Sequence, residues 1–186
     1  MTTLADSLPP RHVLAPPAPV GAAPGTGDLV DLFKAAMGRL SGAVTVITAG
    51  RGAAARGLTA TAVCSVSIAP PTLLVCVNRS GEAHRAIAES GSFCVNVLAE
   101  ANRAVADRFA GRAGAFGGER FAGGDWSELA TGAPALDGAL VNVDCRIAEA
   151  VEAYTHTVFF GTVAAVRLGT GGAPLVHFDR AYRSLA

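Results

Sequence analysis

A short polar segment, Asn78-Arg79-Ser80, follows an apolar run and leads into a helix predicted over residues 81–89. The first backbone N–H groups of a helix have no partner within the helix, so they point toward any anion placed at its start. Arg79 adds a positive charge there, and His84 and Arg85 follow one turn into the helix. The spacing predicts a site for a phosphate group, although Ser80 could equally act only as a helix cap.

Residues 58–68 alternate between two kinds of side chain, which predicts a strand. Small apolar residues lie on one face, while the other face carries the hydroxyl groups of Thr59, Thr61, Ser65 and Ser67. Such a face leaves room for a flat ring against the backbone, with hydroxyl and amide groups available to its edge. The same pattern also fits an ordinary half-exposed strand whose hydroxyl groups face water.

Motifs of hydrolysis and of P-loop or Rossmann nucleotide binding are absent from the sequence. It contains no G-x-S-x-G, no H-E-x-x-H, no G-x-x-x-x-G-K-[ST] and no strand followed by G-x-G-x-x-G. The four histidines, His12, His84, His156 and His177, are too widely spaced for a metal-binding motif, so no metal site is predicted.

Composition narrows the class of protein further. Fifteen basic and fifteen acidic residues give a formal net charge of zero, which argues against a nucleic-acid partner. No apolar stretch is long enough to span a bilayer, and the N-terminus does not read as a secretory signal. The four cysteines form no C-x-x-C pair and lie in apolar runs, as reduced buried thiols do, so a cytoplasmic protein is expected.

The remaining pattern predicts one mainly β domain over residues 27–186, preceded by a flexible Ala/Pro/Gly-rich arm over residues 1–26. Helices are expected before Gly42, over 81–89 and over 100–109, and a long Gly-rich loop over 111–138. Strands are expected over residues 43–48, 58–68, 72–78, 92–98, 141–151, 156–168 and 174–178. Many strands with few helices indicate an antiparallel barrel with helical covers.

In this order, the segments resemble the short-chain flavin reductase family, the reductase components of two-component flavin-dependent monooxygenases. The matching segments cover nearly all of residues 30–186. They are FKAAM (33–37), SGAVTV (41–46), RGLTATA (56–62), SVS (65–67), PP (70–71), VNRS (77–80), FCVNVL (93–98), RFAG (108–111), RF (120–121), Trp126, TGAP (131–134), His156, FG (160–161) and YRSL (182–185).

The resemblance implies a split β-barrel of Greek-key antiparallel strands, usually a homodimer that holds FMN or FAD partly between its subunits. It implies that the isoalloxazine edge lies along Thr59, Ala60, Thr61 and Ala62, and that Ser65 and Ser67 help to place the ring or the ribityl chain. The residues implied around the ribityl phosphate are Cys76, Val77, Asn78, Arg79, Ser80, Ala83 and His84, with Asn96 nearby. Phe109 is also expected among the cofactor-binding residues, and His156 borders the nicotinamide as the catalytic residue.

The activity that the resemblance implies is hydride transfer from NADH or NADPH to FMN or FAD, with the reduced flavin passed to a separate monooxygenase. The cofactors supply the reactivity, so the lack of a nucleophile or paired carboxylates fits this chemistry. The family commonly has Gly-Asp-His where this chain has Tyr154-Thr155-His156. Two competing hypotheses are a non-catalytic flavin- or haem-binding split-barrel protein and an enzyme of the pyridoxamine-phosphate-oxidase type.

A homodimer is also expected from composition. Hydrophobic residues make up 51% of the chain and charged residues 16%, which leaves little charge to cover a lone barrel of this size. An apolar surface patch is normally buried by association.

Overall fold

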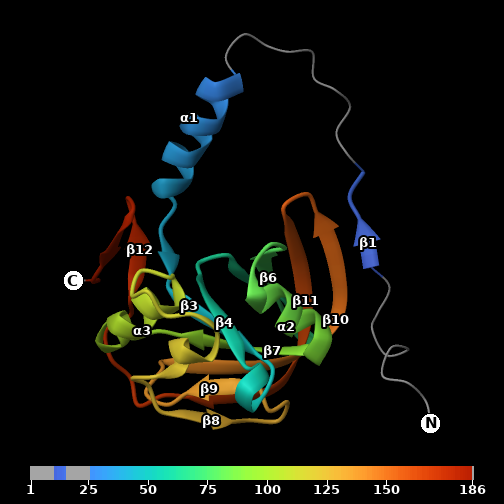
Figure 1. The fold of residues 1–186 in the computed structure, drawn as a ribbon, viewed down its shortest axis with the longest axis vertical. Coiled ribbons are helices and arrows are strands. Elements are labelled where there is room, and N and C mark those ends of the chain that lie inside the picture. The colour runs from blue at the N-terminus through green and yellow to red at the C-terminus, as the bar shows by residue number, and fades with distance from the viewer. Residues whose placement is uncertain (1–10, 16–25, 186) are drawn as a thin grey trace.

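The computed structural model describes residues 11–15 and 26–185, which fold mainly into β-strands with a few short helices (Figure 1). Most strands and helices lie close to the ranges that the sequence predicts. The elements in chain order are β1 (Arg11–Val13), α1 (Thr26–Gly38), β2 (Gly42–Ala43), β3 (Thr45–Ala49), η2 (Gly52–Ala54), β4 (Arg56–Ala60), β5 (Val63–Ile68), β6 (Pro71–Asn78), α2 (Glu82–Ser90), β7 (Ser92–Val97), η3 (Glu100–Asn102), α3 (Arg103–Phe109), η4 (Gly117–Phe121), β8 (Trp126–Glu128), β9 (Pro134–Leu136), β10 (Val141–Ala153), β11 (His156–Leu168), β12 (Val176–Phe178) and β13 (Ala181–Arg183).

The largest sheet has eight strands, ordered β4-β3-β7-β10-β11-β6-β5, with β1 paired to β10 off this path. All neighbours on the path are antiparallel, whereas β1 runs parallel to β10. Two smaller sheets have the orders β13-β12-β2 and β8-β9. The pairings among the described residues show a mainly β fold with β4 and β5 as the two edges, and they show no closed barrel.

The strand predicted over residues 58–68 is in fact two strands at opposite edges of the sheet. β4 pairs with β3 and β5 pairs with β6, and Thr61 and Ala62 connect them. The alternation of side chains continues across this break, so periodicity alone does not reveal it. The hydroxyl groups expected on one strand therefore belong to two strands, Thr59 to β4 and Ser65 and Ser67 to β5.

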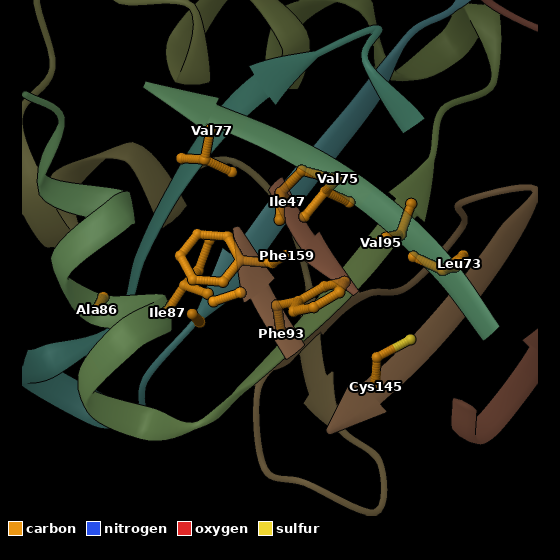
Figure 2. Packing of buried hydrophobic residues seen from close by; sticks show 12 residues of the cluster. Ile47, Leu73, Val75, Val77, Ala86, Ile87, Phe93, Val95, Cys145 and Phe159 are labelled. Atoms are coloured by element: carbon orange, nitrogen blue, oxygen red, sulfur yellow. The ribbon is translucent and has the colours of Figure 1, made fainter. Parts of the chain in front are cut away.

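The main hydrophobic core lies between the sheet and α2 (Figure 2). Phe93 of β7 and Phe159 of β11 are almost fully buried at its centre, and Ile87 packs the helix onto them. Burying each such side chain contributes about 1.5–3 kcal/mol. Gly161 of β11 passes over Phe93, because a Cβ there would stand 2.5 Å from Phe93 Cζ and 2.8 Å from the Cβ of Cys145.

A buried polar network supports the other part of the sheet. Asn96 on β7 is fully buried; its amide donates to Val46 O at 2.9 Å, and its Oδ1 accepts from Leu136 N and Asn142 Nδ2, both at 2.7 Å. Asp144 on β10 accepts from the backbone N–H of Thr131 at 2.7 Å and from its hydroxyl at 2.5 Å. The segment 111–138, which the sequence predicts as a loop, contains η4, β8 and β9. Hydrogen bonds of Thr131 and Leu136 fix its second half to the sheet.

Helix α1 stands clear of the sheet in Figure 1. Its C-terminal end is attached through the N–H of Asp179, which donates to Gly38 O at 2.6 Å. Its apolar side chains are largely exposed, including Leu29 at 68%, Leu32 at 66% and Phe33 at 61%. Within residues 11–15 and 26–185, no helix is long and apolar enough to cross a membrane.

The predicted flexible arm over residues 1–26 is described only in part. Its residues Arg11–Val13 form β1, and Leu14 N donates to Glu152 O at 2.9 Å. The hydroxyl of Tyr154 donates to Ala15 O at 3.2 Å. Residues 1–10 and 16–25 lie outside the described residues. The described part of the arm thus forms a strand that the Pro/Ala composition did not predict.

Candidate functional site

The polar segment predicted to bind phosphate forms the turn between β6 and α2. Asn78 closes this turn, because its Oδ1 accepts from the backbone N–H of Ser80 at 2.9 Å and from the Ser80 hydroxyl at 2.8 Å. The helix cap is Gly81 rather than Ser80, and no side chain caps the helix. Ala83, Ala86 and Ile87 are buried and hold the helix in place. The first N–H groups of α2 therefore face outward at a fixed position, as an anion site requires.

His84 lies in the first turn of α2 and its ring orientation is fixed. Its Nε2 is 2.8 Å from the hydroxyl of the buried Thr157 on β11, and its ring is 5.4 Å from that of Phe159. This contact ties the helix start to the strand that begins with His156. The structure thus brings the start of α2 next to β11, where Thr157, the residue after His156, contacts His84.

The tip of the β10–β11 hairpin forms the opposite wall of the site. His156 lies directly across from Asn78 in the sheet register, is half-buried, and has its Nδ1 2.9 Å from the hydroxyl of Thr155. Arg79 Nη2 forms an ion pair with Glu152 Oε2 at 3.1 Å. Tyr154 has a φ of 54°, a left-handed conformation that favours glycine.

Two hollows meet at the helix start and share Asn78, Ser80 and His84. The first has a volume of about 520 Å³ and is also lined by Arg79, Tyr154 and Thr155. The second has a volume of about 310 Å³, and its remaining lining residues are Gly57, Leu58, Val77, Gly81, Glu82, Ala83, Phe116 and Arg120. The sequence predicted the α2 side of the second hollow but not Gly57, Leu58, Phe116 or Arg120. Of these, Gly57, Leu58 and Arg120 lie in segments that match the family, and that match was their only signal.

A third hollow, of about 210 Å³, lies along the predicted ring-binding segment. It is lined by Thr59, Ala60 and Thr61 and, on its other sides, by Val44, Ala110, Arg112, His177 and Tyr182. The Thr59 hydroxyl donates to Ala106 O at 2.6 Å, so it also anchors α3. Arg112 and Arg103 lie over the Tyr182 ring at 5.2 and 5.4 Å from its centroid. The sequence pattern gave no signal that Arg103, Arg112 and Tyr182 lie together.

Several predicted cofactor residues are not brought to these hollows. Asn96 and Phe109 are buried in the interior, Asn96 in the polar network and Phe109 against Phe121 and Trp126. Both side chains therefore hold the fold together at their observed positions. The remaining predicted residues that line none of the three hollows are Ala62, Ser65, Ser67, Cys76 and His156.

Two other features lie outside the site. A hollow of about 440 Å³ at the C-terminal end of α2 contains none of the predicted residues. Across the described ranges 11–15 and 26–185, no group of three or more His, Cys, Asp or Glu residues could hold a metal ion.

An open antiparallel sheet with an outward-facing helix start beside two hollows defines a class of β-protein suited to bind a phosphorylated ring compound. Comparison with known proteins specifies the family. Residues 37–186 match the flavin reductase like domain, so the chain belongs to this family.

Individual relatives agree with this assignment. The chain is 44% identical over 153 residues to FMN reductase (NADH) RutF of Agrobacterium fabrum, covering 82% of this chain and 87% of the relative. It is also similar to BorF, the flavin reductase component of a bacterial two-component tryptophan halogenase, with a TM-score of 0.77, 32% identity, and coverage of 84% and 98%. The NADH:FAD oxidoreductase of Streptomyces globisporus, solved with NAD and FAD fragments, gives a TM-score of 0.77, 30% identity, and coverage of 86% and 94%.

Proposed function

We propose that this protein is an NADH-dependent flavin reductase, which reduces FMN and supplies the reduced flavin to a separate monooxygenase. The observation that carries the proposal is the helix start at Gly81, placed beside two hollows in a chain of the flavin reductase family. NADH and FMN are the cofactors in the name of the Agrobacterium relative. Similarity to BorF, the reductase component of a two-component halogenase, supports a role in a two-component system.

The residues present fit a flavin mononucleotide. The first turn of α2 offers backbone N–H groups and Arg79 offers a positive charge, which suits a phosphate dianion. Thr59, Ala60 and Thr61 line a separate shallow hollow with small side chains, which suits a flat ring. A bound flavin supplies the electron acceptor for the hydride of the nicotinamide.

The protein's own contribution is to hold and orient the two ring systems and to exclude water. His156 is the side chain that we assign to the nicotinamide, either as a hydrogen-bond partner of its carboxamide or as a proton donor. Its ring is oriented by the Thr155 hydroxyl, and the strand register keeps it across from Asn78. The proposal thus requires a positioned imidazole and no protein nucleophile.

We also propose that the sheet is of the split-barrel type and that two copies of the chain associate. Exposed apolar side chains on α1, together with Ile68 at 92% and Leu168 at 76%, support association. Sedimentation at micromolar concentration is expected to give twice the monomer mass. A monomer that still binds flavin tightly would contradict the dimer. The cytoplasmic location expected from the sequence stays a prediction.

The decisive experiment is NADH oxidation by the purified protein with and without added FMN, with NADPH and FAD tested in parallel. We expect oxidation of NADH that depends on FMN. Flavin binding without any NADH oxidation would contradict the reductase and favour a non-catalytic flavin-binding protein. Bound haem in place of flavin would favour a haem-binding split-barrel protein, and a bound pyridoxal compound would favour an enzyme of the pyridoxamine-phosphate-oxidase type.

A further inference from the structure

The half of β10 that leads to the hairpin tip has a second neighbour, which comes from the N-terminal arm. The pairing of β10 with β7 ends where Arg146 lies opposite Ser92, and β10 continues beyond this point. There β1 runs parallel to it, with Val13 opposite Glu152, which in turn lies opposite Thr157 on β11 (Figure 1). An edge strand exposes one row of backbone groups to water and opens more readily than an inner strand. By pairing here, β1 makes this part of β10 an inner strand.

Two hydrogen bonds continue the attachment beyond the end of β1, as far as the hairpin tip. Leu14 N donates to Glu152 O at 2.9 Å, and the Tyr154 hydroxyl donates to Ala15 O at 3.2 Å. Tyr154 has a φ of 54°, which costs energy for a residue that carries a side chain. Contacts with residues 11–15 therefore stabilise a turn whose backbone is locally unfavourable.

The side chains of the β1 segment contribute little to this attachment. Those of Val13 and Leu14 are 69% and 49% exposed. His12 forms an ion pair with Glu149 at 3.4 Å, but both partners are exposed, and such pairs stabilise a fold only slightly. The backbone groups of residues 11–15 and the hydroxyl of Tyr154 therefore carry the attachment.

The hairpin tip that these contacts hold is a wall of the proposed site. Tyr154 and Thr155 line the 520 Å³ hollow, and the Thr155 hydroxyl is 2.9 Å from Nδ1 of His156. On the other side of the tip, Arg79 N donates to Thr155 O at 3.0 Å. The tip is thus held between the turn before α2 and residues 11–15. Loss of the second attachment would leave it held from one side only.

We propose that residues 11–15 position the tip of the β10–β11 hairpin, and with it His156, for the nicotinamide. Residues 11–15 line none of the three hollows, so they act through the hairpin, and Tyr154 is the positioning residue that joins the two. This inference rests on the proposed function, because it concerns the same His156. FMN binding should depend on it little, since buried side chains of α2 hold the start of that helix in place.

The test compares steady-state NADH oxidation and equilibrium binding of FMN in the full-length wild type and in variants. Leu14→Pro removes the N–H that donates to Glu152 O. Leu14→Ala is the matched control, because it also shortens the exposed side chain but keeps the N–H. Tyr154→Phe removes only the hydroxyl that donates to Ala15 O. Hydrogen exchange of residues 150–157 and the thermal midpoint are measured for each protein.

We expect Leu14→Pro and Tyr154→Phe each to lower kcat/KM for NADH by about threefold or more, the size of one lost hydrogen bond. The Kd of FMN should change by less than about twofold. Amide exchange of residues 150–157 should become faster in both variants, while the thermal midpoint hardly moves. Leu14→Ala should behave as the wild type does. Tyr154→Phe added to Leu14→Pro should cause little further loss, because both act through one attachment.

Faster exchange with unchanged kcat/KM would overturn the positioning role, and unchanged exchange would overturn the attachment itself. Losses that add in the double variant would also overturn the proposal, because Tyr154 would then act on the ligand without residues 11–15. Equal weakening of FMN and NADH would place the effect on the flavin side and overturn it as well. A wild-type protein that oxidises no NADH would instead overturn the proposed function, whereas the exchange data would still report whether residues 11–15 hold the hairpin.

Discussion

Two asparagines occupy very different environments, although both were predicted to lie near the flavin. Asn78 ends β6 at an exposed turn, where its side chain accepts hydrogen bonds from the adjacent Ser80. Asn96 is fully buried on β7, and its amide joins β3, β9 and β10. The residue type is the same, but the neighbours determine the role. A polar residue marks a binding site only where its surroundings leave hydrogen-bonding groups open to a ligand.

The largest expected effect concerns stability and comes from the buried member of the pair. Asn96→Ala deprives Leu136 N–H of its acceptor and removes one hydrogen bond each from the Asn142 amide and Val46 C=O. A buried group left unsatisfied costs about 1–3 kcal/mol, and each lost bond adds about 0.5–1.5 kcal/mol. We expect the free energy of unfolding in urea to fall by about 3 kcal/mol. Asn78→Ala is the control, and we expect it to lower the free energy of unfolding by less than about 1 kcal/mol. Equal losses in the two variants would contradict the different roles of Asn96 and Asn78.

A smaller effect, on binding rather than stability, is expected at the exposed turn. Arg79→Ala should weaken FMN binding by about 1–3 kcal/mol, as for a lost charge-assisted hydrogen bond. Riboflavin, which lacks the phosphate, should bind almost unchanged. Arg39→Ala is the control, since it removes the same charge from an exposed position after α1. If FMN and riboflavin lose affinity equally, Arg79 does not bind the phosphate, and its role is limited to its contacts with Glu152 and Tyr154 O.

The next effect is expected on the rate of catalysis, from a change at His156, which lies across from Asn78 in the sheet. His156→Ala is expected to lower turnover by more than about tenfold, the usual range for a lost proton donor or positioning group. Steady-state NADH oxidation measures the effect, and the thermal midpoint should hardly move because the ring is only half-buried. His12→Ala, which removes an exposed imidazole paired with Glu149, serves as control. Wild-type turnover without His156 would remove it from the mechanism.

Much of this contrast lay beyond what the sequence could predict. The strands, the start of α2 and the position of Arg79 beside that helix start follow from side-chain periodicity, apolar runs and the residues at the helix end, which are local properties. The break at Thr61 and Ala62 was missed because small residues continue the alternation through it. The burial of Asn96 depends on residues 131–142, which the pattern reads mostly as a Gly-rich loop. Whether a residue such as Asn96 is buried is determined by residues that are distant in the sequence.

The smallest effects concern the four cysteines, of which Cys76 and Cys94 lie two residues before Asn78 and Asn96. Burial raises the pKa of the Cys94 thiol far above the ordinary value of 9.0, and Asp144 raises it further. Burial also raises the pKa of Cys76, which is less enclosed, and that of Cys145 to about 12. We expect a thiol reagent at pH 8 to modify the exposed Cys64 first, then Cys76, and to reach Cys94 only on unfolding. Mass spectrometry of the labelled peptides gives the order.

The same thiols make stability depend on pH, with a definite sign. A folded pKa above the unfolded value means that the native state holds the proton more tightly. This contribution is complete below pH 9.0 and is lost as the pH rises from there toward the folded value of about 12 for Cys145. Unfolding in urea should therefore become easier between these two values. A stability that stays constant over this range would contradict the buried thiols.

The position of the β10–β11 hairpin has a consequence for how the chain is made on the ribosome. This hairpin lies between β7 and β6, yet it is synthesised after both of them. Until residues 141–168 emerge, a nascent chain that has already paired β4-β3-β7 and β5-β6 presents β7 and β6 as two further open strand edges, besides β4 and β5. Unpaired edges invite association with other chains. Synthesis thus passes through a stage at which the last hairpin competes with aggregation, and translation that pauses before Val141 should lower the yield of active protein.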